Sequence, residues 1–147
     1  MYGKIRDFSR KPINAYFLNH TNTQNYKKFI NAAFKYADTV CMTYNGSFRE
    51  FSQSEWAFLK DSVTGHEITN HTSVPKGPTV CLIYLKTDDT VRSWLMERDN
   101  IYDFIYYDEW FDDLCFVKNG EVVFCSCTHE KFCHINKEWS ENLEQTL

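Results

Sequence analysis

The sequence predicts an α/β (α+β) fold, a single layer of mainly antiparallel sheet about four to six strands wide with helices packed against it. Three observations lead to this fold class. Residues 23–37 carry an apolar stripe, residues 79–85 are almost continuously apolar, and an Asn-Gly step joins the apolar runs 114–118 and 121–125. The first pattern is typical of a helix on a core, the second of a covered strand and the third of a hairpin.

Length and composition indicate one folded domain. A chain of 147 residues has the usual size of a single domain. Hydrophobic residues make up 43% of it and aromatic residues 17%, which excludes a disordered chain because such chains lack the apolar surface that offsets their ordering entropy. We therefore treat residues 1–147 as one domain, with residues 1–20 as an N-terminal extension and residues 137–147 as a C-terminal helix that frays.

The first helix is the clearest predicted element. Its apolar residues fall at the spacing of one helix face, at Tyr26, Phe29, Ile30, Ala33, Phe34 and Ala37. Asp38 ends this stripe, and residues 39–44 change to β-branched and aromatic character. Asn45-Gly46 follows directly and favours a tight turn, so a strand is expected between the helix and this turn.

The next segment predicts a short helix and then an inner strand. Ser52 and Glu55 have the spacing of a capping box, and Trp56 and Leu59 then give the helix an inner face. The prolines of residues 75–78 block both helix continuation and strand pairing. The apolar run directly after them is expected in the middle of the sheet.

A third helix follows this strand. Asp88 or Asp89 is expected to cap it, and its inward residues would be Val91, Trp94 and Leu95. Residues 101–111 are aromatic and acidic, and their pattern predicts no particular element.

The last third of the chain predicts a hairpin and a terminal helix. Asn119-Gly120 separates two apolar runs, and this dipeptide tolerates the positive φ angles of a type I′ turn. A polar helix is expected from about Lys137.

The sequence also bears on compartment. Residues 1–7 lack the apolar core of a signal peptide, and no window of about eighteen apolar residues occurs. We therefore expect a cytoplasmic protein without a membrane partner. In that compartment the six cysteines are expected to be free, buried thiols rather than disulfides.

Charge is unevenly distributed along the chain. Residues 1–96 carry 12 basic and 8 acidic residues, residues 97–120 carry 2 and 7, and residues 121–147 carry 2 and 5, for a net charge of −4. An acidic second half argues against a nucleic-acid partner, since such proteins normally present a basic stripe. It favours a basic protein partner instead.

One segment gathers residue types that bind metals, namely Cys125, Cys127, His129, Cys133 and His134. Zinc prefers such ligands, but Cys125 and Cys127 are separated by a single residue at a strand end and do not form a knuckle in a turn. A nucleophilic cysteine with His129 or His134 as base needs electropositive surroundings, and the surroundings here are acidic. Buried thiols are therefore favoured, with no metal or other cofactor.

The most informative segment for function is residues 106–113, in which large rings alternate with carboxylates. Aromatic anchors and acidic groups are the chemistry of an interface that takes up a cationic partner. The predicted partner-binding residues are Asp108, Glu109, Trp110, Asp112 and Asp113. The competing interpretation places Trp110 and Phe111 in the core and leaves the acids facing water.

Several motifs resemble a pattern shared by small, largely uncharacterised bacterial domains. They are residues 34–38 (Phe-Lys-Tyr-Ala-Asp), residues 75–78 (Pro-Lys-Gly-Pro), Trp110, residues 112–116 (Asp-Asp-Leu-Cys-Phe) and residues 126–130 (Ser-Cys-Thr-His-Glu). The resemblance covers about residues 26–135 and departs from the pattern in the extra twenty-five residues at the N-terminus and in the cysteines. Such small acidic domains are similar to the immunity proteins that neutralise secreted bacterial toxins. The resemblance implies a structural role for His129 and Glu130 at the end of the hairpin.

These observations predict a non-enzymatic protein-binding module of the immunity or antitoxin type, with a basic, toxin-like protein as partner. The alternative is a small metal- or thiol-dependent hydrolase centred on Cys125, Cys127, His129 and Cys133. A third class, a ligand-sensing domain with an aromatic pocket, rests only on the aromatic content. Familiar catalytic motifs, such as a phosphate-binding glycine loop or a nucleophile elbow, do not occur.

Overall fold

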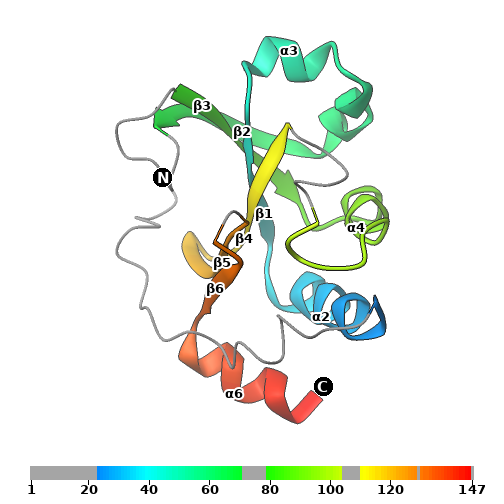
Figure 1. Cartoon of the computed structure of the whole chain (residues 1–147), viewed down its shortest axis with the longest axis vertical. Helices are drawn as coiled ribbons and strands as arrows, with labels where there is room; N and C mark the ends of the chain where they lie inside the picture. Colours follow the sequence, from blue (N-terminus) through cyan, green and yellow to red (C-terminus); the bar gives the residue numbers. More distant parts are fainter. Residues whose placement is uncertain (1–22, 71–78, 104–109, 129, 147) are drawn as a thin grey trace.

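One antiparallel sheet organises the fold. The computed structural model describes residues 23–70, 79–103, 110–128 and 130–146, and these contain six strands in the order β2-β3-β1-β4-β5-β6 (Figure 1). Their bounds are Thr39–Tyr44 (β1), Val63–Asn70 (β2), Thr79–Lys86 (β3), Phe111–Lys118 (β4), Glu121–Cys127 (β5) and Phe132–Ile135 (β6). Every neighbouring pair is antiparallel. The predicted α+β class with an antiparallel sheet is confirmed.

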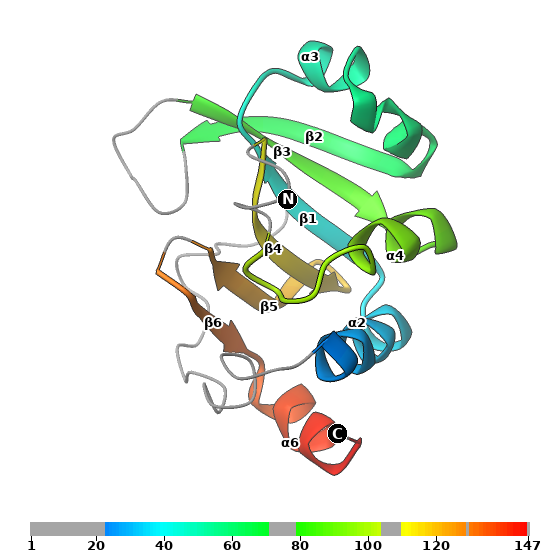
Figure 2. The same ribbon diagram turned by 45° about the vertical axis from the view of Figure 1, so that its right-hand side comes forward.

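Helices accompany this sheet along one side. They are Thr23–Tyr36 (α2), Phe48–Ser52 (α3), the 3-10 helix Glu55–Ser62 (η2), Asp89–Leu95 (α4) and Lys137–Thr146 (α6). In both Figure 1 and Figure 2, α3 lies at one end of the molecule, α4 and α2 lie beside its middle and α6 lies at the other end. The predicted helices at residues 23–37 and from Lys137 are therefore present.

The main core lies between these helices and one face of the sheet. Val40, Met42 and Tyr44 alternate along β1 and are at most 1% exposed, as expected for side chains that all point to one face. The predicted stripe of α2 packs against this face, with Tyr26, Phe29, Ile30 and Ala33 fully buried. Burying one large apolar side chain contributes about 1.5–3 kcal/mol, so this stripe supplies most of the stability of α2.

The opposite face of the sheet carries a second, smaller cluster. Cys41 pairs with Tyr84 of β3 and with Cys115 of β4, and Cys115 pairs with Cys125 of β5. Residues directly opposite each other across strands lie on the same face, so these four side chains form a row, and all four are buried. Free thiols are confirmed for all six cysteines; five are buried and Cys127 is half-buried.

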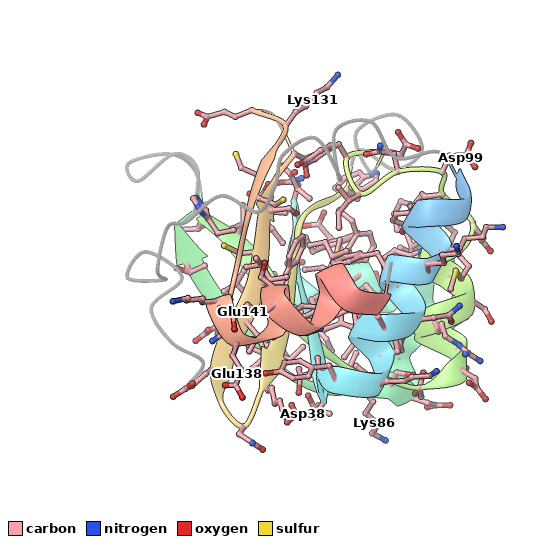
Figure 3. All side chains as sticks on the ribbon, turned by 90° about the horizontal axis from the view of Figure 1, so that it is seen from below. Asp38, Lys86, Asp99, Lys131, Glu138 and Glu141 are labelled. Carbon is pink, nitrogen blue, oxygen red and sulfur yellow. The ribbon has the colours of Figure 1, made fainter. Side chains whose placement is uncertain are left out.

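Two local signals act as predicted. Asp88 is the N-cap of α4, where its side chain accepts a hydrogen bond from the backbone N–H of Val91 at 3.0 Å. The hairpin turn has positive φ at Asn119 (51°) and Gly120 (79°). The carboxylate of Asp38, labelled in Figure 3, accepts from the backbone N–H of Asn119 at 2.8 Å and so fastens the hairpin to the start of β1.

The predicted capping box at Ser52 and Glu55 is wrong. The box forms at Ser47 and Glu50, where Ser47 Oγ accepts from the Glu50 N–H at 3.0 Å and the Glu50 carboxylate accepts from the Ser47 N–H at 3.3 Å. Ser52 is the last residue of α3, and its hydroxyl donates to the carbonyl of Phe48. Both serines precede a glutamate by three residues, so spacing alone does not distinguish them.

Two strands have no counterpart in the sequence pattern. β2 is a mixed polar segment that contains Gly65, and β6 spans only four residues. Pairing with β3 and with β5 makes them strands. The strand predicted at residues 79–85 is an inner one, because β3 lies between β2 and β1, but β1 and β4 form the middle of the sheet.

Two further observations complete the fold. Most of the segment 101–111 lies outside the described residues, but Phe111 begins β4. Within the described part of the chain, no helix is both long enough and apolar enough to cross a membrane.

Candidate functional site

Trp110 lies directly before β4 and is the predicted anchor residue that the structure places at the surface. It is 42% exposed. Its ring stacks on the ring of Tyr44, with 5.8 Å between centroids and 21° between planes, and its carbonyl accepts from the N–H of Asn45 at 2.7 Å. A Cβ at Gly46 would lie 2.8 Å from the Tyr44 ring and 3.4 Å from the Trp110 ring. The turn predicted at Asn45-Gly46 therefore leaves the space in which Trp110 packs.

Strand register and shared contacts connect the large exposed hydrophobic side chains among the described residues to Tyr44. They are Phe58 (54%), Ile68 (80%) and Trp110. Ile68 pairs with Cys81 of β3, and Cys81 pairs with Tyr44 of β1. Ile68 therefore lies in the same row and on the same face of the sheet as the residue on which Trp110 stacks.

Trp56 connects Phe58 to the same group. Its ring lies 6.3 Å from the ring of Tyr44 at 71°, and it lines one pocket together with Phe58. Trp56 is predicted to lie on the inner face of its helix, and in the structure its ring is half-buried. We refer to Tyr44, Trp56, Phe58, Ile68 and Trp110 as the apolar end.

The expectation that Asp112 and Asp113 face a partner is corrected by their burial, with exposures of 3% and 4%. The Asp113 N–H donates to Thr128 Oγ1 at 3.1 Å, and the Thr128 N–H donates to Asp113 Oδ1 at 2.9 Å. Asp112 Oδ1 also accepts from the Asp113 N–H at 2.9 Å. The pairing register of β4 with β1 shifts here, and Asp113 has a φ of 51°. Asp113 therefore fastens a bulge of β4 to Thr128, directly after β5, and Asp112 accepts a hydrogen bond within the bulge.

The carboxylates that lie at the apolar end belong to Glu50 and Glu55 and not to Asp112 and Asp113. Glu50 Oε2 lies 3.1 Å from the Cβ position of Gly46, the same position that contacts Trp110, and Glu55 lines the pocket beside Trp56. Both glutamates are exposed. Asp108 and Glu109, the remaining predicted acids, lie outside the described residues.

The predicted structural motif at His129 and Glu130 is only partly described. His129 lies outside the described residues, and Glu130 is exposed in the turn between β5 and β6. The N–H of Lys131, which is labelled in Figure 3, donates to the carbonyl of Thr128 at 3.3 Å and closes this turn. The structural role of His129 and Glu130 stays a prediction.

The candidate thiols do not converge on one site. Cys125 pairs with His134 and belongs to the smaller cluster, whereas Cys133 pairs with Ser126 and belongs to the main core, so the two thiols lie on opposite faces of the sheet. Burial raises the pKa of the Cys125 thiol to about 12 and that of Cys133 to about 11. A nucleophilic cysteine needs a lowered pKa, which is the opposite shift. Within the described ranges, no group of three or more His, Cys, Asp or Glu residues could hold a metal ion.

A pocket of about 340 Å³ opens between η2 and α4, beside the apolar end. Its lining residues are Glu55, Trp56, Phe58, Trp94, Glu97 and Arg98. The buried ring of Phe111 meets Trp56 at 5.6 Å and Trp94 at 4.9 Å, edge-on in both cases. The two indoles are therefore held in place by a core residue of β4.

Arg98 forms the buried side of this pocket. Its guanidinium carbon lies 4.9 Å from the centroid of the Trp94 ring, and its NH1 donates to the carbonyl of Trp94 at 2.9 Å. The Glu97 carboxylate lies 4.0 Å from the same NH1 group. Arg98 is 4% exposed, so its charge is withdrawn from the surface.

Sequence reasoning missed this pocket because its walls come from segments far apart in the chain. One local signal was available: Trp56 and Phe58 are two residues apart, and two rings at this spacing cannot both face the core from one helix.

Comparisons of the chain with protein-family models, with curated proteins and with solved structures found no match in any of the three.

Proposed function

We propose that this chain is a non-enzymatic protein-binding module of the immunity or antitoxin type, which binds a basic protein through an acidic and apolar surface. The observation that carries the proposal is that Phe58, Ile68 and Trp110 are exposed and that contacts and strand register connect all three to Tyr44. Single exposed hydrophobic residues are ordinary on protein surfaces, but neighbouring ones mark interaction sites.

The exposed ring of Trp110 is held in place, as an interface anchor requires. Trp110 stacks on Tyr44, which is only 1% exposed and is itself in edge contact with Phe51 and Phe111. A ring that is already held loses little conformational entropy when a partner covers it. Tryptophan is also among the residues most often found to dominate binding free energies.

Charge around the apolar end supports a basic partner. Glu50 and Glu55 are exposed beside the rings, and the chain as a whole carries a net charge of −4. Arg49 and Lys60 are also exposed on α3 and η2, so the local field is mixed and the carboxylates next to the rings would select the partner's cationic groups.

Capture from the native host tests this function. The tagged chain is incubated with lysate at low and at high salt, the retained proteins are identified by mass spectrometry, and the affinity of each is then measured with purified proteins. We expect a basic protein whose binding weakens at high salt, because screening reduces the attraction between exposed charges.

Matched variants locate the binding surface. Trp110→Ala and Phe58→Ala are each expected to weaken binding at least about tenfold, as the loss of an interface anchor does. Tyr36→Ala is the control, because Tyr36 is a half-buried ring stacked on a buried one, Trp139, and neither ring belongs to the apolar end. Equal affinity of all three variants, or a partner that is acidic and insensitive to salt, would overturn the proposal.

A further inference from the structure

We propose that the pocket between η2 and α4 binds the guanidinium group of an arginine side chain. The inference deepens the proposed function and rests on it, because it names the group of the basic partner that this chain recognises. The pocket adjoins the apolar end through Trp56 and Phe58, which belong to both. In Figure 2 the helical segment after α3 and the helix α4 lie next to each other at the side of the sheet.

Aromatic rings form the accessible wall of the pocket. Phe58 is 54% exposed and Trp56 is half-buried, whereas Trp94 is only 2% exposed. An incoming group therefore meets Trp56 and Phe58, and a cation over such a ring is attracted by its quadrupole. Contacts of Trp56 with Tyr44 and Phe111 fix the indole before any ligand arrives.

The charges that a solute reaches first are negative. Glu55 is exposed, and the side chain of Glu97 is 70% exposed, whereas the side chain of Arg98 is 5% exposed. Arg98 already donates to the Trp94 carbonyl and lies 4.0 Å from Glu97. The pocket lining therefore has two carboxylates, of Glu55 and Glu97, and one guanidinium, of Arg98, which gives a net negative charge. The carboxylates are exposed and the guanidinium is buried.

This arrangement favours a guanidinium over an anion and over a lysine ammonium. An anion would have to pass two carboxylates to reach Arg98. A guanidinium is planar, so it can stack on an aromatic ring while its N–H groups bond a carboxylate in a forked geometry, which a point-like ammonium cannot do. At about 340 Å³ the pocket is at the small end of ligand sites, as suits a single side chain.

A titration without any partner protein tests the pocket. N-acetyl-arginine amide, N-acetyl-lysine amide and sodium acetate are added separately to the full chain at low salt. The indole N–H signals are followed by two-dimensional ¹H–¹⁵N NMR, with Trp139, which is 2% exposed and lies on α6, as the internal reference. The arginine probe is expected to shift the Trp56 signal, to bind more tightly than the lysine probe and to leave Trp139 in place.

Charge variants complete the test. Glu55→Gln is expected to weaken binding of the arginine probe about threefold, as the loss of one exposed ion pair would. Glu141→Gln is the matched control, since Glu141 is an exposed acid on α6 at the opposite end of the molecule (Figure 3). Equal effects of the two variants, or a Trp56 shift produced by acetate and not by the arginine probe, would overturn the proposal.

The two proposals fail in different ways. If the arginine probe binds at Trp56 but no protein requires Trp110 for capture, the pocket stands and the proposed function falls. If a basic protein is captured through Trp110 but Glu55→Gln leaves the probe titration unchanged, the function stands and the pocket assignment falls.

Discussion

Replacement of Asp113 by alanine tests whether this acid belongs to the fold and not to a binding surface. In the structure Asp113 Oδ1 accepts from the N–H of Thr128, a residue that is fully buried, at 2.9 Å. Asp113 also has a φ of 51°, in the left-handed region that aspartate and asparagine tolerate better than other residues with a Cβ. Alanine removes the acceptor and leaves this conformation strained.

The expected loss follows from these two terms. A buried N–H left without its partner costs about 1–3 kcal/mol, and the left-handed conformation costs alanine about 1–2 kcal/mol. We therefore expect Asp113→Ala to lower the free energy of unfolding by about 3 kcal/mol. With an m-value of about 2 kcal/mol per molar urea, the unfolding midpoint falls by about 1.5 M.

Urea unfolding followed by tryptophan fluorescence measures this shift. Asp113→Asn is the matched control, because asparagine keeps the Oδ1 acceptor and tolerates positive φ, and it is expected to lose less than half of what alanine loses. Thr128→Val removes the reciprocal acceptor, and its effect should not add to that of Asp113→Ala because the two residues share one pair of hydrogen bonds. An alanine variant that unfolds at the wild-type midpoint would refute the assignment of Asp113 to the fold.

Three further predictions concern buried groups. Tyr26→Phe removes the hydrogen bond that the hydroxyl donates to the Leu95 carbonyl at 2.7 Å, and urea unfolding should show a loss of about 1 kcal/mol; no loss would mean that this bond does not tie α2 to α4. Burial raises the pKa of Cys125 to about 12 and that of Cys133 to about 11. Iodoacetamide at pH 8 should therefore label both thiols far more slowly in the native than in the unfolded protein. Peptide mapping measures the two labelling rates, and equal rates would contradict the burial of these thiols. Thiols with a raised native pKa stabilise the fold fully below their unfolded pKa of about 8.5 and lose this contribution as the pH rises toward their native values, so the urea midpoint should fall between about pH 9 and 11.

Local chemistry made much of the fold predictable. The apolar stripe of α2 depends only on the helical spacing of residues within one segment. Asn119 and Gly120 by themselves adopt the positive φ angles of the hairpin turn. Asp88 caps α4 through an N–H three residues away. In each case the cause and the effect lie within a few residues, which is the range over which sequence patterns act.

The candidate site was predictable only in part, because the same residue type can serve the core or the surface. Trp110 is exposed as the interface interpretation requires, and its neighbour Phe111 is buried as the core interpretation requires. Asp112 and Asp113 follow in the same acidic run, yet both are buried at a bulge, where Asp113 bonds Thr128 and Asp112 accepts from the Asp113 N–H. Alternation of rings and acids does not reveal a bulge.

By itself the sequence determined the helix on the core, the inner strand, the hairpin and the acidic, aromatic character of the chain, because each depends on side chains close together in the sequence. Only the tertiary structure decided that β2 and β6 are strands, since their partners supply the hydrogen bonds. It also decided which large hydrophobic residues are exposed. Ile68 lies in the same row as Tyr44, with Cys81 between them, and Glu55 and Glu97 line one pocket. Strand register and helix packing bring together these segments, which are far apart in the chain.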